Sequence, residues 1–343
     1  MSNKIVEISC NAGVSPTSSI AVPARPRLAI CFSGNPRKIL ENRAAWDKTF
    51  DEYNKSFDLS FYFHCWSETG LVKRLENEFI EGEYVRGRYS DFDQLVSWLN
   101  PEAFSIESLS PEFEQKTENF PNVILNINQA GKRAILSQVY SIERANDIRR
   151  EFERLNPKLR ADVVLRLRFD LFPLELQIED YLWLVENKSV PVVFVQSPRY
   201  HRHPGGGGGC LECERFFQEY RHFPDCNARF QEFLKNHQVH GNDICDLFAA
   251  ATPAIMDRYA SLFSRAEAIW QEINAHNADA DRHAELAVEG VELHPDLRIV
   301  SVSGDYGQTI ENNVHCFYPE KLLRFALPNV LVLHGINTFS IVR

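Results

Sequence analysis

The chain has 343 residues, of which 44% are hydrophobic, 12% aromatic and 24% charged. This ordinary composition excludes a disordered chain, a collagen helix and a coiled coil, and the length allows a hydrophobic core that needs no disulfide bonds. Its 47 acidic and 37 basic residues give a net charge of −10, which repels polyanions and makes duplex nucleic acid a poor partner.

The compartment is inferred from two patterns that the sequence lacks. No apolar stretch approaches the roughly 20 residues that cross a bilayer, and the N-terminal region has no signal-peptide pattern. We therefore expect a cytoplasmic protein with at most peripheral association at the inner membrane face. Cys31 and Cys65 lie in apolar runs, and in a reducing compartment they are expected to be small core residues.

The first predicted elements follow a leader. Residues 1–26 are rich in Ser, Pro, Ala, Asn and Gly without a regular period, and we interpret them as flexible. Residues 28–32 form a continuous apolar run, which is typical of a strand buried on both faces. A helix is then predicted to start at Pro36, because proline is favoured at the first helical position. Its apolar stripe comprises Ile39, Trp46, Phe50 and Tyr53.

Strands and helices then continue to alternate. Four further strands are predicted in apolar and aromatic runs, at residues 57–66, 104–107, 163–172 and 190–196. A long amphipathic helix is predicted at residues 131–150. Strands that alternate with helices imply βαβ crossovers, and therefore a mainly parallel sheet.

The last third of the chain is less regular. Five consecutive glycines, at 205–209, indicate a flexible insertion, which we place at residues 201–230. Beyond it we predict a helix capped by Thr252 and two late strands, at residues 297–303 and 329–334.

The fourth predicted strand carries charges on one face. With a period of two, Arg166, Arg168 and Asp170 share one side of this strand. Buried unpaired charges are costly, so this face either forms an internal ion network or binds an ionic ligand. Ligands of open α/β sheets bind beyond the carboxyl ends of the strands, and arginine suits a diphosphate, so we favour the ligand.

The turn after the first strand is a second candidate site. Ser33, Gly34 and Arg37 belong to the turn at the carboxyl end of this strand and at the entry of the predicted helix, where backbone N–H groups and the positive end of the helix dipole can bind an anion. No Walker A or G-x-G-x-x-G pattern occurs there. The alternative is an ordinary turn, since Ser, Gly, Asn and Pro are common turn residues.

Three of the predicted strands and the long helix contain distinctive sequence blocks, at residues 28–37, 57–66, 137–142 and 166–171. In this order the blocks resemble those of bacterial surface-polysaccharide glycosyltransferases, which act in lipopolysaccharide and capsule synthesis. The resemblance covers about residues 27–175 and, more loosely, residues 240–263. It implies a GT-A-like, Rossmann-type α/β fold: a mainly parallel sheet flanked by helices, with a more irregular C-terminal half.

The resemblance also implies where the substrates bind. Residues 27–200 would hold a nucleotide-diphosphosugar donor at the first turn and the fourth strand. Residues 231–343, the other half of the same catalytic domain, would face a saccharide or lipid-linked saccharide acceptor.

The sequence departs from this family at the metal-binding motif. Many GT-A enzymes carry Asp-x-Asp at the end of the fourth strand, whereas this chain has Arg168, Phe169 and Asp170. One interpretation is that Asp170, with waters and phosphate oxygens, holds Mg²⁺ or Mn²⁺. The other is that the Arg168 guanidinium stabilises the leaving diphosphate directly.

Three further polar residues complete the candidate site. Asp243 is our candidate general base, because an inverting transfer needs a carboxylate to accept the acceptor hydroxyl proton; a turn or helix cap is the alternative. Gln138 is preferred over Tyr140 as the donor-facing residue of the long helix, because its amide can bond to a base or ribose. His64 closes the second strand, and a packed core histidine is its alternative.

A separate cluster has potential zinc ligands: Cys210, Cys213, His222 and Cys226. Its spacing matches no common zinc finger, and the alternative is an irregular loop with reduced thiols. The leading functional prediction is therefore glycosyl transfer. The alternatives are a noncatalytic protein that binds a saccharide or nucleotide sugar, and a zinc-stabilised interaction module.

Overall fold

The computed structural model describes most of the predicted core but leaves out several of the predicted site residues. The described residues are 25–36, 39–71, 74–75, 78–79, 85–88, 91–108, 111–120, 129–173, 178–196, 211–236, 248–277, 291–294, 299–302, 323, 326–327, 330–335 and 339–341. Arg37, Cys210 and Asp243 lie outside these ranges.

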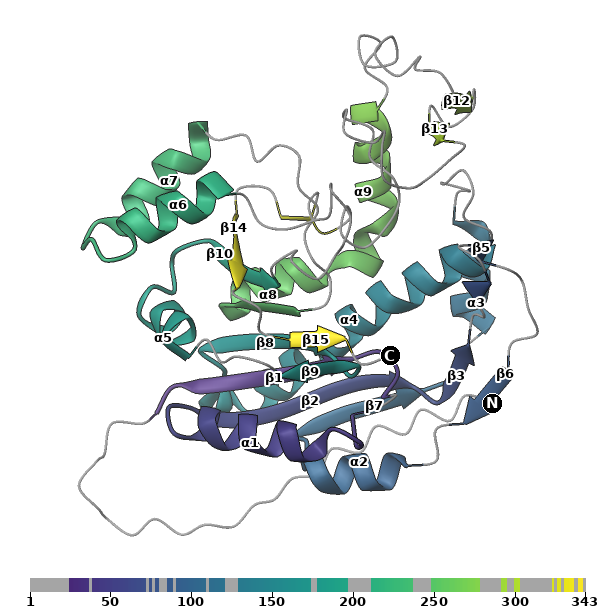
Figure 1. Cartoon of the computed structure of the whole chain (residues 1–343), viewed down its shortest axis with the longest axis horizontal. Coiled ribbons are helices and arrows are strands. Elements are labelled where there is room, and N and C mark those ends of the chain that lie inside the picture. The colour runs from purple at the N-terminus through teal and green to yellow at the C-terminus, as the bar shows by residue number, and fades with distance from the viewer. Residues whose placement is uncertain are drawn as a thin grey trace.

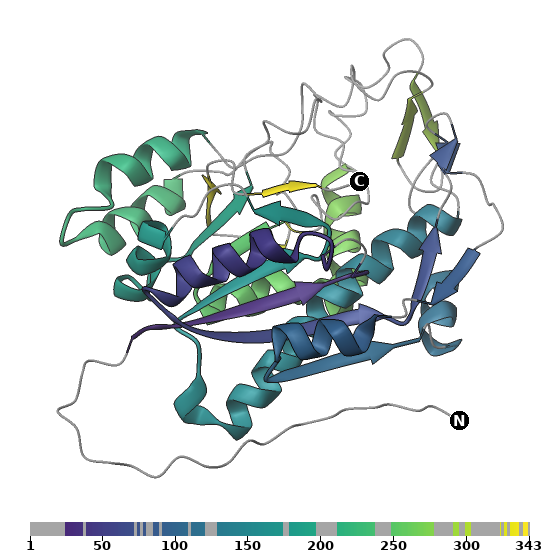
Figure 2. The same ribbon diagram turned by 60° about the horizontal axis from the view of Figure 1, so that its bottom comes forward.

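A seven-stranded sheet lies at the centre of the fold (Figures 1 and 2). In spatial order its strands are β14 (Leu331–Gly335), β10 (Val192–Gln196), β11 (Phe248–Ala251), β8 (Val163–Arg168), β1 (Arg27–Ser33), β2 (Asp58–Trp66) and β7 (Ala103–Glu107). All neighbours pair in parallel except β11, which is antiparallel to both β8 and β10. If these seven strands are numbered 1 to 7 in chain order and read from β7 to β14, their spatial order is 3-2-1-4-6-5-7. The first four have the order of a Rossmann sheet.

Helices cover both faces of this sheet. On one face lie α1 (Arg43–Asn54), α2 (Phe92–Leu99) and α5 (Ile178–Glu186); on the other lie α4 (Gln129–Leu155), α8 (Pro253–Ala260) and α9 (Leu262–Asn277) (Figures 1 and 2). Within the first of these groups, ring contacts join α1 to α2: the ring centroids of Phe50 and Trp98 lie 6.1 Å apart. The structure thus confirms the predicted α/β fold, with a mainly parallel sheet flanked by helices.

The central strands are apolar because both of their faces are covered. Residues 28–32 of β1 are all buried, and Phe32 packs edge-on against Trp46 of α1 at 5.5 Å. Cys31 and Cys65 are both buried with free thiols, which confirms their prediction as core residues.

Several predicted boundaries were wrong. The predicted strand at 163–172 stops at Arg168, and after a turn the chain continues as β9 (Leu171–Pro173), which pairs with β15 (Phe339–Ile341). The predicted strand at 297–303 corresponds to β13 (Ile299–Val302), which pairs with β12 (Val291–His294) outside the main sheet.

The predicted irregular insertion contains helices in its described part. These are α6 (Leu211–Tyr220) and α7 (Cys226–Asn236), which project from the sheet beyond α5 (Figure 1). Trp183 of α5 packs edge-on against Phe217 at 4.8 Å, and its indole N–H donates to the Arg221 carbonyl at 3.0 Å. The apolar spacing that forms these helices was overlooked because the preceding glycines suggested a loop.

The remaining elements are small. They are α3 (Pro111–Asn119), a 3-10 turn (Pro157–Leu159) and the short strands β3 (Glu68–Leu71), β4 (Arg74–Leu75), β5 (Glu78–Phe79) and β6 (Val85–Arg88).

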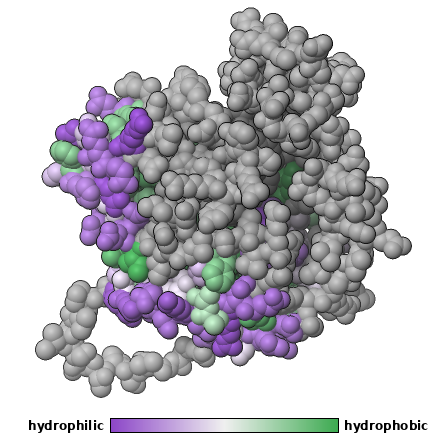
Figure 3. Space-filling view, viewed as in Figure 1, coloured by the Kyte–Doolittle hydropathy of each residue, from purple (hydrophilic) through white to green (hydrophobic). Residues whose placement is uncertain are grey.

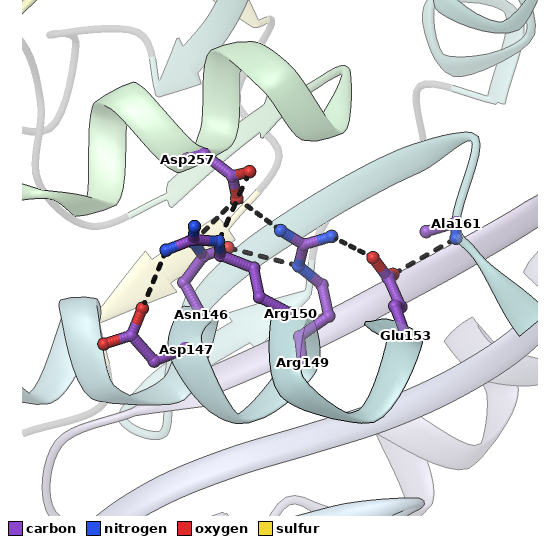
Figure 4. Close-up of polar contacts among 7 residues, drawn as sticks. All are labelled: Asn146, Asp147, Arg149, Arg150, Glu153, Ala161 and Asp257. Atoms are coloured by element: carbon purple, nitrogen blue, oxygen red, sulfur yellow. Dashed lines mark hydrogen bonds and ion pairs between the residues drawn. The ribbon is translucent and has the colours of Figure 1, made fainter. Parts of the chain in front are cut away.

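A buried ionic cluster joins α4 to α8 (Figure 4). Arg149 of α4 is 1% exposed, and its guanidinium binds Glu153 at 2.6 Å and also contacts Asp257 of α8 and Asn146. The Asn146 amide donates to Asp257 at 2.9 Å. The second Glu153 oxygen accepts the Ala161 N–H at 3.1 Å, which ties the segment before β8 to the same cluster.

On the side of the molecule that Figure 3 shows, the described surface is largely polar. Hydrophilic residues predominate over α6, α7 and α1 in this view, with scattered apolar residues among them (Figure 3). Among the helices that the structure describes, none has the length and apolar character needed to span a bilayer.

Candidate active site

Four neighbouring strands bring polar side chains together at their carboxyl ends. Ser33 of β1 is in register with His64 of β2 and Arg168 of β8, and His64 is in register with Ser105 of β7. Residues in register project to the same face of a sheet, so these four side chains form one row, which we call the polar row. It crosses the junction of β1 and β8, where the strand order reverses and α/β sheets bind their ligands.

Two arginines of β8 share the face of the polar row. Arg166 is 2% exposed, and its Nε donates to the Ser33 hydroxyl at 3.3 Å. Arg168 is a quarter exposed and binds Asp170 with two parallel bonds, from Nε to Oδ1 at 2.9 Å and from Nη2 to Oδ2 at 2.6 Å. Two guanidinium groups, one of them paired with Asp170, therefore lie beside the ends of β1 and β8.

The backbone at Gly34 turns sharply after β1. Its φ angle is +103°, a conformation that favours glycine, and a Cβ at this position would meet no atom of the described residues within 4 Å. The expected role of its N–H was wrong, because this N–H donates to Ser141 Oγ at 2.7 Å and to the His64 carbonyl at 3.2 Å rather than facing an anion. Gly34 contributes open space beside the polar row instead of a hydrogen-bond donor.

The predicted helix dipole at this turn was also wrong. Helix α1 begins at Arg43 rather than at Pro36, after a turn in which the Asn42 N–H donates to the Ile39 carbonyl. Ile39 is completely buried, so the chain first inserts this side chain into the core and only then becomes helical. A helix N-terminus therefore does not follow directly on Gly34.

His64 is the centre of a buried hydrogen-bond network. Its Nδ1 lies 2.8 Å from Ser141 Oγ, and its Nε2 faces Glu107 of β7, with 3.7 Å between Nε2 and Oε2. Glu107 in turn accepts hydrogen bonds from Tyr140 at 2.7 Å and from Arg144 at 2.8 Å. These residues come from β2, β7 and α4, and they enclose the end of β2.

The environment of this network shifts the pKa values of its members. Burial lowers the pKa of His64 below its usual 6.5, although Glu107 partly opposes the shift. Burial alone would raise the pKa of Glu107, but His64, Arg144 and Tyr140 outweigh it and hold that pKa well below its usual range. At neutral pH the network therefore contains a neutral imidazole and an ionised carboxylate.

Helix α4 supplies the predicted Gln138 and the Tyr140 that was set aside. Tyr140 belongs to the network through Glu107, and its ring stacks on Trp66 with 5.1 Å between centroids. Gln138 is half-buried and lies three residues before Ser141. Because α4 returns antiparallel to the strands, Gln138 lies toward the carboxyl edge of the sheet relative to Ser141.

The residues at the end of β8 do not fit a divalent cation held by Asp170. Both carboxylate oxygens already bind the Arg168 guanidinium, and the charges of Arg166 and Arg168 would repel the ion. Within the described ranges, no group of three or more His, Cys, Asp or Glu side chains could hold a metal ion.

The zinc prediction gains no support from the residues that can be seen. Cys226 is buried, and its thiol donates to Asn187 at 3.4 Å, whereas His222 is exposed in the turn between α6 and α7. Cys210 lies outside the described residues, and the side chain of Cys213 does as well.

Sequence reasoning missed the α4 and β7 part of the site. Ser141, Arg144 and Glu107 were not selected, and they are distant in sequence from the strands that they contact. One signal was present: Glu107 is a carboxylate at the end of a short strand. Arg37 and Asp243, which were selected, lie outside the described residues.

Comparisons with known proteins give limited information. No protein-family model matches this chain, and no curated protein matches it. Among solved structures, the chain is similar to the galactosyltransferase LgtC in complex with donor and acceptor sugar analogues, with a TM-score of 0.34 and 10% sequence identity over 90% of this chain and 73% of that chain. A likeness at this level carries no argument about function.

Proposed function

We propose that this chain is a glycosyltransferase that moves a sugar from a nucleotide-diphosphosugar to a saccharide or lipid-linked saccharide in surface-polysaccharide synthesis. The observation that carries the proposal is the pair of β8 arginines, Arg166 and Arg168, placed at the junction where the strand order reverses. Guanidinium groups at this place suit a diphosphate in shape and in charge. The sequence blocks that resemble surface-polysaccharide glycosyltransferases supply the class of reaction.

We assign the binding roles from the contacts of the described residues and from the sequence. Arg166 and Arg168 neutralise the diphosphate, and Asp170 orients the Arg168 fork. Gly34 leaves space for the donor beside Ser33, which holds Arg166. Gln138 contacts the base or ribose, and Arg37 completes the donor-binding set. His64, which the sequence also suggested for this set, is completely buried and is not given a contact with the donor.

The reaction breaks the bond between the anomeric carbon and the diphosphate oxygen and forms a bond from that carbon to the acceptor oxygen. The arginines stabilise the negative charge that collects on the leaving diphosphate. Asp243 accepts the proton of the acceptor hydroxyl if the transfer inverts the anomeric carbon. No step requires a metal ion at Asp170.

The direct test uses the common uridine, guanosine and cytidine nucleotide sugars. Purified protein should be protected against thermal unfolding by at least one of them and should release the nucleoside diphosphate of that donor when an acceptor is present.

Arg168→Lys keeps the charge but loses the two-pronged bond, so donor affinity should fall about tenfold or more. Arg154→Lys is the matched control, because Arg154 pairs with Glu151 on the exposed far end of α4. Absence of binding across all donors would contradict the proposal.

The role of Asp243 has its own test. Asp243→Asn should keep donor affinity and lose transfer by a factor on the order of 10² to 10⁴, the usual worth of a positioned base. Near-native transfer would show a turn or cap role and leave Asp246 as the next carboxylate to test.

A noncatalytic nucleotide-sugar-binding protein is the second candidate. It is favoured by one observation, that both oxygens of Asp170 are engaged by Arg168. This candidate predicts thermal protection by a nucleotide sugar without release of nucleoside diphosphate under any acceptor condition.

A further inference from the structure

A chain of polar contacts runs from the end of β1 to the end of β7: hydrogen bonds link Gly34, Ser141 and His64, and an ionic contact of 3.7 Å links His64 to Glu107. The Gly34 N–H donates to Ser141 Oγ at 2.7 Å, and Ser141 Oγ lies 2.8 Å from His64 Nδ1. The opposite side of the imidazole faces Glu107, which Tyr140 and Arg144 hold in place. We call Gly34, Ser141, His64 and Glu107 the relay.

The direction of each bond in the relay follows from the partners. A carboxylate near Nε2 favours the tautomer in which Nε2 carries the proton, which leaves Nδ1 as an acceptor. The Ser141 hydroxyl then donates to Nδ1, and its oxygen lone pairs accept the Gly34 N–H. Glu107 therefore fixes the tautomer of His64, His64 fixes the rotation of the Ser141 hydroxyl, and Ser141 fixes the Gly34 N–H.

The relay buries polar groups in the core, which lowers the stability of the fold. His64 and Ser141 are completely buried, and Nε2 of His64 makes no hydrogen bond. A buried polar atom without a hydrogen bond costs stability, and apolar side chains of similar volume would avoid that cost. The relay meets the backbone at the Gly34 N–H and, through a 3.3 Å hydrogen bond from Ser141 Oγ, at the His64 carbonyl. Of these two residues, Gly34 has the unusual φ of +103°, which keeps the space beside the polar row open.

We infer that Ser141 and His64 are positioning residues: they hold the Gly34 backbone in the conformation that leaves room for the nucleotide-diphosphosugar, and Glu107 orients them. This inference rests on the proposed donor site. It adds residues that touch neither the donor nor the acceptor but determine the shape of the space into which the diphosphate fits.

The first test compares Ser141→Ala with Thr117→Val. Each removes one buried hydroxyl, but Thr117 bonds only to the Phe113 carbonyl within α3. The Kd values of UDP, GDP and CDP are measured for each protein, together with the hydrogen-exchange rate of the Gly34 amide. Ser141→Ala should weaken nucleotide binding about three- to tenfold, the usual worth of one hydrogen bond, and accelerate exchange at Gly34. Thr117→Val should change neither quantity.

The second test replaces His64. Asparagine offers its side-chain oxygen near the place of Nδ1 and can accept the Ser141 hydroxyl, whereas leucine cannot. His64→Asn should therefore retain most of the nucleotide affinity, and His64→Leu should resemble Ser141→Ala. If His64 only filled the core, His64→Leu would retain more nucleotide affinity than His64→Asn, because leucine packs better in an apolar core.

The outcomes separate this inference from the proposed function. If the wild type binds a nucleotide and Ser141→Ala binds it equally well, the positioning role is overturned and the proposed function stands. If the wild type binds none of the three nucleotides, the proposed function fails, and Gly34 exchange decides: unchanged exchange in Ser141→Ala overturns the relay, and faster exchange supports its hold on Gly34.

Discussion

Arg168 and Asp170 are two residues apart in the sequence and form a planar, two-bond ion pair at the edge of the sheet. A pair of this geometry holds the guanidinium in one orientation, and Arg168 is a quarter exposed while Asp170 is buried. The carboxylate therefore holds this arginine of the polar row in a fixed position.

Asp170→Asn should weaken both the fold and donor binding. Removing one charge of a largely buried pair leaves the other uncompensated, and because Arg168 is partly solvated we expect a loss of about 1–3 kcal/mol in the free energy of unfolding. Donor affinity should fall as well, since the guanidinium loses its orientation. Urea unfolding and nucleotide titration measure the two effects.

A surface pair gives the control for this prediction. Asp225→Asn removes the partner of the exposed Arg229 on α7 and should leave the melting temperature and donor affinity nearly unchanged. Donor affinity that is unaltered in Asp170→Asn would show that the ion pair has a structural role only.

His64 should make stability depend on pH. Because burial lowers its pKa below the usual 6.5, the unfolded chain binds more protons than the folded chain in the range just below pH 6.5. The stability that the neutral imidazole supplies is therefore present above pH 6.5 and is lost as the pH falls toward the folded pKa, by at most about 1.4 kcal/mol per pH unit.

The measurement isolates His64 by difference, since the chain has 11 histidines. Urea unfolding of the wild type and of His64→Asn at pH 7.5, 6.5 and 5.5 should give a steeper decline for the wild type. The ionised Glu107 does not interfere, because its low pKa places its own effect below about pH 4.5. Parallel declines in the two proteins would contradict the assignment.

Residue-level prediction succeeded where a local period exists and failed where contacts are distant. The alternation along residues 163–168 identified Arg166 and Arg168 on one face, because the geometry of a strand alone determines which side chains share a face. Glu107 and Ser141 escaped, because their partner His64 lies on another strand and only the tertiary fold brings the three together.

At the scale of elements, α4 is the piece that organises the fold. Its N-terminal half places Ser141 and Tyr140 at the carboxyl ends of the strands, and its C-terminal half holds the Arg149 cluster against α8. One helix thus supports the candidate site and joins the first half of the chain to the second. Sequence periodicity found this helix, but not its polar buried contacts, since those depend on α8.

Arg149→Met should destabilise the protein strongly. Methionine keeps about the same volume but leaves the buried Glu153 without its cation and the half-buried Asp257 with only the 3.6 Å contact of Arg150 (Figure 4). Breaking a buried ion pair by removing one partner costs about 3–5 kcal/mol in the free energy of unfolding.

The control is Arg150→Met, one residue further. It removes a mostly exposed guanidinium that contacts Asp147 and Asp257, and it should lower the free energy of unfolding by less than about 1 kcal/mol. Equal losses in the two variants, measured by urea unfolding, would show that the buried cluster contributes no more than a surface pair.

At the scale of the whole molecule, the two halves of the chain share one sheet. Strand β11 comes from residues 248–251, yet it lies between β8 and β10, and β14 near the C-terminus pairs with β10. Sequence alternation indicated the fold class from the first half. It could not indicate that a later, reversed strand is inserted at this place, because the residues of β11 are a short run of Phe and Ala without a directional signal.

This interleaving leads to a prediction about fragments. A fragment of residues 25–200 retains β1, β2, β7 and β8 but lacks β11, so β8 becomes an exposed edge and β10 loses both of its neighbours. Unpaired edges of apolar strands associate with other chains. We expect this fragment to aggregate or to unfold without a cooperative transition, as judged by gel filtration and thermal circular dichroism. Residues 25–343, which lack most of the leader predicted at residues 1–26, should elute as a folded protein and melt within about 2 °C of the full chain, since the composition of that leader predicts few contacts with the core. A soluble fragment of residues 25–200 with a cooperative melt would show that the first half folds by itself and that β11 joins a sheet already formed.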